Sequence, residues 1–269
     1  MKKIIFCDID NTLTKYSFKV SKQNIESIKK FTDAGGDFVL TTGRSIVSAR
    51  KIQDQINEAL QMKPKYIICS NGGYIVDNVN GDVDIYTIDE SICRQLYRII
   101  IKQRVWGMFY TDLSNDLRGV FITKLWFWFF LGIFKNLNAL KIRENTDLSS
   151  FKIIICHYKK SRIKQFAKIL DKSFGKKVSY VMTTPFSIEI NALGVNKASG
   201  VQKILERADL NKQDAAAIGD SGNDVPLFKM VSLPIAVKTK NADVIRNSLV
   251  YIPKFKNGVS IAIEKYIMK

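Results

Sequence analysis

Histidine, cysteine and proline are scarce in this chain. Among 269 residues there are one histidine, four cysteines and five prolines. The cysteines are scattered and form no Cys-x-x-Cys pair, which argues against a zinc cage and predicts reduced thiols in a cytosolic protein. The single histidine, His157, follows an expected strand. With no His/Cys cluster around it in the sequence, we interpret His157 as a structural residue rather than a catalytic one.

The chain also lacks a hydrophobic segment long enough to cross a bilayer. Its strongest apolar run, residues 125–134 (LWFWFFLGIF), is far short of the roughly 20 residues that a spanning helix needs. A buried helix or strand is the favoured interpretation; a pocket wall, an oligomer contact or a membrane-surface patch stay open. No signal peptide is visible, because the apolar run after Lys2 and Lys3 ends at Asp8. We therefore expect a cytoplasmic protein with no transmembrane segment.

The charge is strongly one-sided, with 42 basic and 25 acidic residues and a formal net charge of +17. The basic residues are spread along the chain, and each expected helix mixes them with acidic or amide residues. This pattern does not favour nucleic acid as a partner. We interpret the charge as a field that helps to attract phosphorylated small substrates.

Strands and helices alternate over the first 80 residues. Strands are expected at 3–7, 37–41 and 66–69, with helices at about 21–34 and 45–60 between them, which predicts a parallel sheet. The pattern then changes: two short strands flank an Asn80-Gly81 turn, and mixed helices and alternating strands follow. The α/β alternation returns with a helix at 197–207 and strands at 215–218 and 233–237. We predict an α/β core of residues 1–82 and 190–269 with an inserted α+β domain at 83–189.

Asp8 and Asp10 are the most informative pair in the sequence. They follow the apolar run of residues 3–7 directly, and an unpaired buried charge is costly, so they belong at the end of that strand. The carboxyl ends of strands line the ligand crevice of open α/β sheets. Such a pair suits a hard cation and a phosphate, although an Asx-rich turn is the plain alternative.

Three further polar signals strengthen the functional interpretation. Thr42-Gly43-Arg44 follows the second strand, Lys197 begins a late helix, and Gly219-Asp220-x-x-Asn223-Asp224 follows the next strand. Each alone has a structural explanation as a turn, a cap or a solvated lysine. Because parallel strands end at one edge of a sheet, the four signals together predict a single site.

With these motifs the sequence resembles the haloacid dehalogenase (HAD) superfamily of phosphohydrolases, and more closely its Cof-type branch. The resemblance covers both core segments and includes Ser70-Asn71-Gly72-Gly73, which is typical of that branch. It implies a Rossmann-like parallel sheet with an inserted α+β cap. Asn11 stands where the family commonly has glycine, and because asparagine tolerates left-handed backbone angles we expect the turn to survive.

The resemblance assigns a role to each motif residue. It makes Asp8 the nucleophile, Asp10 the general acid/base, Thr42 a ligand of the phosphoryl oxygens and Lys197 the cation that pairs with nucleophile and phosphate. Mg²⁺ is expected at Asp8, Asp220 and the backbone carbonyl of Asp10. Phosphate or substrate contacts are expected from Thr42, Gly43, Arg44, Asn71, Lys197 and Asn223. Asp224 is expected to contact and orient these residues without touching the ligand itself.

The predicted function is a Mg²⁺-dependent phosphatase of small phosphorylated metabolites, such as a sugar phosphate, a nucleotide or a phosphorylated cofactor. Asp8 would form an aspartyl-phosphate that water then hydrolyses. A phosphotransferase or phosphomutase uses the same motifs and stays open, as does a non-catalytic binding module. The sequence leaves the substrate, the cap contacts and an oligomer formed through the cap undecided.

Overall fold

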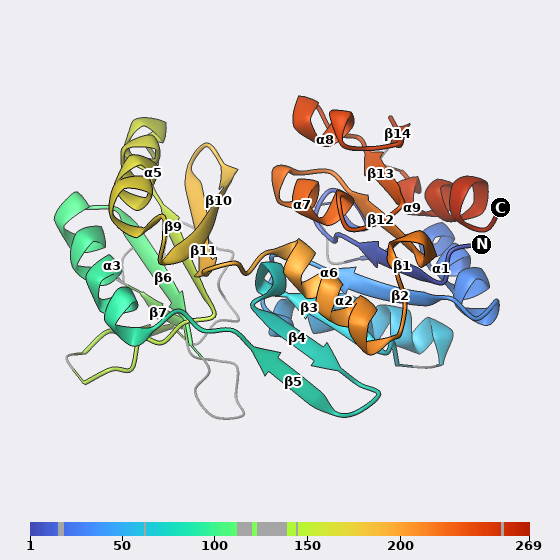
Figure 1. The fold of residues 1–269 in the computed structure, drawn as a ribbon, viewed down its shortest axis with the longest axis horizontal. Coiled ribbons are helices and arrows are strands. Elements are labelled where there is room, and N and C mark those ends of the chain that lie inside the picture. Colours follow the sequence, from blue (N-terminus) through green and yellow to red (C-terminus); the bar gives the residue numbers. More distant parts are fainter. Residues whose placement is uncertain (16–18, 62, 112–119, 123–138, 144, 254–255) are drawn as a thin grey trace. The chain divides into compact units, whose positions relative to one another are not determined.

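The computed structural model describes residues 1–15, 19–61, 63–111, 120–122, 139–143, 145–253 and 256–269. The chain divides into two compact units (Figure 1). The first contains Met1–Asp84 and Val195–Lys269, and the second contains Ile85–Gly194. The sequence-based boundaries of the insertion were 82/83 and 189/190. The apolar run at 125–134 lies outside the described residues, so its role stays a prediction.

A single sheet forms the centre of the first unit. Its strands lie in the order β14-β13-β12-β1-β2-β3-β4-β5. Pairing is parallel from β14 to β3, and β4 joins β3 antiparallel. The bounds are β1 Ile4–Cys7, β2 Asp37–Thr41, β3 Tyr66–Cys69, β4 Tyr74–Asp77, β5 Asp82–Ile85, β12 Ala215–Gly219, β13 Leu233–Val237 and β14 Val250–Ile252.

The direction of the crossovers sets the layers of this unit. From β1 the chain moves through β2 to β3 in one direction, and from β12 through β13 to β14 in the other. Because such crossovers are right-handed, the connecting helices lie on opposite faces of the sheet. Helices α1 (Lys22–Asp33), α2 (Ile46–Leu60) and α9 (Gly258–Ala262) make one packed group, whereas α6 (Lys197–Arg207) contacts β3 and α7 (Val225–Phe228).

Local sequence explains where the main helices begin and end. The Ser21 hydroxyl accepts a hydrogen bond from the Asn24 backbone and begins α1, which ends before Gly35 at a φ of +87°. Asn196 and Ser199 form a capping box at the start of α6. The remaining short elements are α8 Ala242–Arg246, a π-helical turn Ile263–Ile267, and 3₁₀ turns Ser70–Gly72, Lys212–Asp214 and Gly222–Asp224.

The second unit has a mixed sheet with its two long helices on one face. The strand order is β10-β11-β9-β6-β7-β8. Phe109, Ile153 and Ile190 point from the sheet into a core that includes Leu96 of α3 and Leu170 of α5. The bounds are α3 Glu90–Gln103, β6 Trp106–Tyr110, β7 Val120–Ile122, β8 Ala139–Lys141, β9 Lys152–Cys156, α5 Lys160–Phe174, β10 Val178–Thr184 and β11 Ser187–Ala192.

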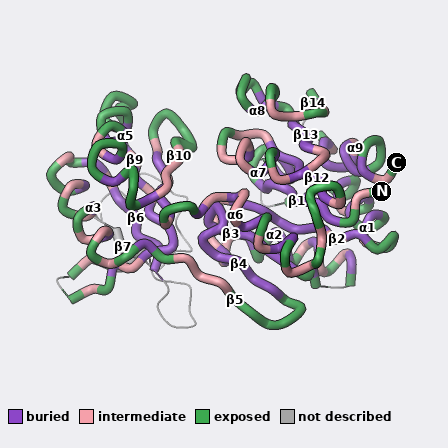
Figure 2. Tube along the Cα trace, viewed as in Figure 1, coloured by how far each residue is buried: buried purple, intermediate pink, exposed green. Residues whose placement is uncertain are grey.

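The predicted α/β fold is confirmed, with a parallel-dominated sheet in one unit and a separate, largely antiparallel sheet in the other. Strands β1, β2, β3, β4, β12 and β13 of the first sheet are buried over most of their length, whereas the edge strand β5 has no buried residue (Figure 2). All four cysteines are free thiols, as predicted, and Cys7 is fully buried. Within the described ranges we find no helix long and apolar enough to cross a membrane.

Candidate active site

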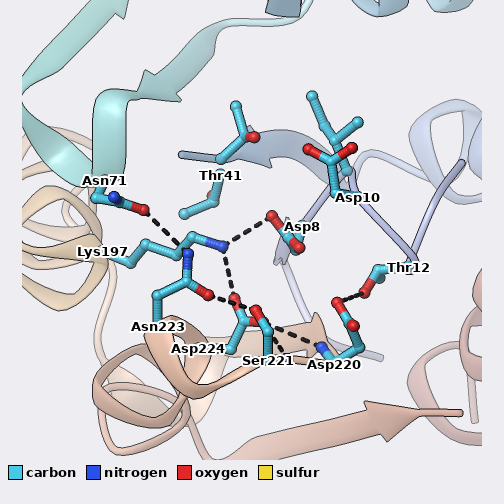
Figure 3. Close-up of polar contacts among 12 residues, drawn as sticks. Asp8, Asp10, Thr12, Thr41, Asn71, Lys197, Asp220, Ser221, Asn223 and Asp224 are labelled. Carbon is cyan, nitrogen blue, oxygen red and sulfur yellow. Dashed lines mark hydrogen bonds and ion pairs between the residues drawn. The ribbon is translucent and has the colours of Figure 1, made fainter. Parts of the chain in front are cut away.

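Two neighbouring strands of the first sheet carry the acidic groups of the site. Strands β1 and β12 pair in parallel, and the Asp8 backbone N–H donates to the Ile218 carbonyl at 2.9 Å. Asp8 and Asp220 therefore follow adjacent strands at one edge of the sheet. Their carboxylates and that of Asp224 offer ligand oxygens within 4.8 Å of one another. The predicted convergence of these strand ends is confirmed (Figure 3).

Asp224 organises the acidic loop around itself. Its Oδ2 accepts hydrogen bonds from the backbone N–H groups of Asp220 and Ser221, each at 3.0 Å. Gly219 is required beside it, because a Cβ there would lie 2.5 Å from the Asp224 Cγ. Thr12 approaches from the β1 side and donates from Oγ1 to Asp220 Oδ1 at 3.1 Å. These hydrogen bonds fix the loop at both ends.

Lys197 lies in the middle of this acidic group. The Asn196 side chain caps α6 by accepting from the Ala198 and Ser199 backbones, which fixes Lys197 as the first helical residue. Its Nζ lies 2.7 Å from Asp8 Oδ1 and 2.7 Å from Asp224 Oδ1, and the side chain is fully buried. The lysine therefore joins the strand-β1 carboxylate to the acidic loop (Figure 3).

Asp10 does not join this group of carboxylates. Its side chain turns to Arg44, which donates from Nε to Asp10 Oδ2 at 2.8 Å and from Nη2 to Asp10 Oδ1 at 2.5 Å. Directly after Asp10 the backbone turns at Asn11, whose φ is +56°. The expectation that asparagine would keep this left-handed turn is confirmed.

The loops after β2 and β3 are fastened to each other. Thr42 is fully buried, and its Oγ1 accepts from the Arg44 backbone N–H at 3.1 Å. The Ser70 N–H donates to the Arg44 carbonyl at 2.8 Å, and the Asn71 N–H to the Thr42 carbonyl at 3.0 Å. The segment Thr42-Gly43-Arg44 is therefore held against the Ser-Asn-Gly-Gly turn.

Three successive residues of that turn have a positive φ: Ser70 (+50°), Asn71 (+56°) and Gly72 (+96°). Such a run stores backbone strain, which is characteristic of functional loops. Asn71 Oδ1 accepts from Asn223 Nδ2 at 3.1 Å, so the turn also contacts the acidic loop. The structure thereby brings all the sequence-predicted site residues into the first unit, and their individual roles stay predictions.

Charge is the main energetic feature of the site. Burial raises the pKa of the Asp8 carboxyl well above its usual range, and Lys197 opposes that shift. Burial and then Asp224 raise the pKa of Asp220 to about 7. Burial acts to lower the pKa of Lys197, but Asp224 and Asp8 outweigh it and raise the pKa above its ordinary value. Three carboxylates around one ammonium leave excess negative charge that a divalent cation can offset.

Sequence reasoning gave Asp224 a supporting place and did not foresee how closely it belongs to the carboxylate group. Its fully buried side chain bonds both Lys197 and the loop backbone. Sequence reasoning also did not foresee the hydrogen-bonded Asp10–Arg44 pair. His157 accepts at Nδ1 from the Lys159 backbone at 2.9 Å and stacks on Trp106, so its ring has partners within the second unit, and its structural role stays a prediction.

Comparison with known proteins identifies the family. A model of the haloacid dehalogenase-like hydrolases matches residues 5–263. The chain belongs to the haloacid dehalogenase-like hydrolases. The assignment to the HAD superfamily and to the phosphatases of its Cof-type branch, made from the motifs, is thereby confirmed.

Relatives of this HAD hydrolase match over nearly its whole length. It is 25% identical over 269 residues to a 5-amino-6-(5-phospho-D-ribitylamino)uracil phosphatase of Bacillus subtilis, covering 99% of this chain and 96% of the relative. A HAD/COF-like hydrolase of Plasmodium vivax has the same fold, with a TM-score of 0.85, 20% identity and coverage of 100% and 96%. A HAD subclass IIB sugar phosphatase gives a TM-score of 0.79, 17% identity and 98% coverage of both chains.

Proposed function

We propose that this HAD hydrolase is a magnesium-dependent phosphatase of small phosphorylated metabolites that works through an aspartyl-phosphate. The observation that carries the proposal is the buried Asp8–Lys197–Asp224 arrangement with Asp220 beside it. A buried lysine between two carboxylates costs desolvation energy, so stability alone is a weak reason to keep it. Phosphoryl transfer gives such a group a use, because positioning and charge do most of that catalysis.

The donor set fits magnesium. Asp8 and Asp220 would hold the ion with the backbone carbonyl of Asp10, and oxygen ligands are those that Mg²⁺ prefers. Asp224 already uses Oδ1 on Lys197 and Oδ2 on the loop backbone, so we assign it to support the site. When bound, the ion supplies positive charge that offsets the repulsion between the Asp8 carboxylate and a phosphate dianion.

The proposed reaction has two steps. An Asp8 carboxylate oxygen forms a bond to phosphorus while the ester P–O bond breaks, and Asp10 gives its proton to the departing alkoxide. Asp10 then takes a proton from a water molecule, whose oxygen bonds to phosphorus as the Asp8 O–P bond breaks. Inorganic phosphate leaves, and Asp8 and Asp10 return to their starting forms.

The other site residues would hold the phosphoryl oxygens. Lys197 is fixed by the α6 cap, and the Thr42 hydroxyl and the Gly43 backbone lie on a loop fastened to the Ser-Asn-Gly-Gly turn. Asn71 and Asn223 are bonded to each other at the same edge of the sheet. Preorganised donors of this kind lower the barrier because they need no rearrangement as charge develops.

Small hydroxylated phosphate esters are the proposed substrate class. One relative is a phosphatase of a phosphoribityl-aminouracil, and one structural neighbour is a sugar phosphatase. We further propose that residues 83–189 act as the cap that selects the leaving group. The four free cysteines support a reducing compartment such as the cytoplasm.

Replacing Asp8 tests this proposal. Phosphate release from a panel of phosphorylated metabolites should require Mg²⁺ in the wild type and fall to background in Asp8→Asn, whose circular dichroism should stay unchanged. Asp54→Asn makes the same change at an exposed position of α2 and should keep full activity. Substantial Mg²⁺-dependent turnover by Asp8→Asn would remove Asp8 as the nucleophile, and transfer of the phosphoryl group to a sugar without free phosphate would replace phosphatase by phosphotransferase.

A further inference from the structure

The Asp10 carboxylate is held by a residue from a different strand end. Asp10 follows β1, whereas Arg44 follows β2, and both carboxylate oxygens accept from the guanidinium, at 2.8 Å from Nε and 2.5 Å from Nη2. Two parallel N–H···O bonds between planar groups fix direction as well as distance. The pair therefore sets where the Asp10 carboxylate points.

Arg44 is the more firmly held partner. Its side chain is 16% exposed and that of Asp10 is 52% exposed. The Arg44 backbone N–H donates to the buried Thr42 hydroxyl, and its carbonyl accepts from the Ser70 N–H. Without the guanidinium, a half-exposed aspartate would be free to rotate about its side-chain bonds.

The backbone beneath Asp10 is also fixed. Asn11 and Thr14 close a tight turn, with the Asn11 N–H donating to the Thr14 carbonyl at 2.8 Å. Because the backbones at Asp10 and Arg44 are both constrained, the direction of the Asp10 carboxylate depends on the ion pair between the two side chains. The sequence-based role of Arg44 was contact with phosphate or substrate, but its Nε and Nη2 groups lie on Asp10.

We propose that Arg44 is a positioning residue for the acid/base Asp10 and does not act chiefly by binding phosphate. This inference rests on the proposed function. Arg44 holds the Asp10 carboxylate outside the Asp8–Asp220–Asp224 group. In the proposed reaction that side chain must reach the leaving-group oxygen and then the attacking water. A displacement of about 1 Å in a catalytic group can cost on the order of 100-fold in rate.

The choice of leaving group separates the two roles. An alkyl phosphate needs a proton on its departing oxygen, whereas p-nitrophenol leaves without one, so general acid catalysis matters little for the phosphorylation step with p-nitrophenyl phosphate. We expect Arg44→Ala to lower kcat/KM for an alkyl phosphate by about 10- to 100-fold and for p-nitrophenyl phosphate by less than about 3-fold. Equal losses with both substrates would overturn the inference.

A double-mutant cycle gives a second, independent reading. In an Asp10→Ala background, Arg44→Ala should cost less than about 2-fold with either substrate, and the inhibition constant of inorganic phosphate should not rise. A full loss in that background, or weaker inhibition by phosphate, would make Arg44 a phosphate ligand instead. Arg44→Lys keeps the charge but not the fork, so it should lose most of the same activity; full activity would overturn the inference.

The controls separate this inference from the proposed function. Arg50→Ala removes the same charge from an exposed position on α2 and should change neither substrate's kcat/KM. Failure of the proposed function shows in the wild type, as absence of Mg²⁺-dependent phosphate release that Asp8→Asn abolishes. Failure of the Arg44 inference shows only in the ratio between the two substrates, and Arg44→Lys gives that ratio even if Arg44→Ala does not fold.

Discussion

Replacing Asp220 with asparagine should stabilise the magnesium-free protein above neutral pH. The folded-state pKa of Asp220 is about 7, against an ordinary value of 3.8. Each unit of difference corresponds to about 1.4 kcal/mol, so ionising this carboxylate in the folded protein costs at most about 4 kcal/mol. Because Asp220 interacts with Asp8 and Asp224, part of that free-energy cost belongs to those carboxylates, and solvent screens another part. We therefore expect Asp220→Asn to raise the free energy of unfolding by about 1–3 kcal/mol.

The sign follows from proton binding. Between about pH 4 and 7 the folded protein binds more protons at Asp220 than the unfolded chain does, so the stability of the wild type falls as the pH rises through this range. The variant lacks this loss. Its advantage over the wild type should therefore be near zero at pH 4 and complete at pH 8.

Urea unfolding monitored by circular dichroism measures this difference, in EDTA and in Mg²⁺ at several pH values. The wild type should gain about 2.7 kcal/mol when Mg²⁺ is present at 100 times its dissociation constant, and Asp220→Asn should gain much less. At one fixed Mg²⁺ concentration, the gain of the wild type should grow as the pH rises toward 7, because Mg²⁺ competes with the proton on Asp220 and its dissociation constant falls. A variant that is less stable than the wild type in EDTA at pH 8, or an advantage of equal size at pH 4 and pH 8, would refute the reasoning.

Two further substitutions test the supports of the site. Lys197→Met leaves Asp8 and Asp224 buried without their ammonium partner, and should lower stability in EDTA by about 3–5 kcal/mol, with part of the loss restored by Mg²⁺; a loss below about 1 kcal/mol in urea unfolding would contradict the pairing. Gly72→Ala would place a Cβ 2.4 Å from the Asn196 carbonyl at a φ of +96°, whereas Gly81→Ala at +77° meets nothing within 4 Å. We expect the first to cost at least about 2 kcal/mol more than the second by thermal unfolding and to lower activity by displacing Lys197, and equal costs would contradict this.

Much of the first unit follows from local sequence. The helices at 22–33 and 197–207 agree with the expected ranges, because Ser21 and Asn196 supply N-caps that the chain itself encodes. The strands of the parallel sheet are short runs of buried apolar residues, which the sequence shows directly. The short C-terminal elements α8, with five residues, and β14, with three residues, were not predicted, because segments this short carry too little hydrophobic periodicity.

For the candidate site, too, some features could be predicted from the sequence and others could not. Convergence of Asp8, Lys197 and Asp220 could be predicted, because the strand ends of a parallel sheet share one edge. The partners of individual side chains could not. Whether Arg44 meets phosphate or Asp10 depends on rotamers and on the fastening of its backbone to Ser70, which lies 26 positions further along the chain. Such contacts between distant segments leave no periodic signal in the sequence.

The second unit is spliced between Asp84 and Val195, both of which belong to the first. Every group that we propose to touch phosphorus comes from the flanking segments. The inserted unit Ile85–Gly194 can therefore change in length or be replaced during evolution without altering the proposed catalytic residues. Any inserted domain must nevertheless end in a way that keeps Lys197 in place, because the chain re-enters the first unit at Val195, only two positions before this lysine.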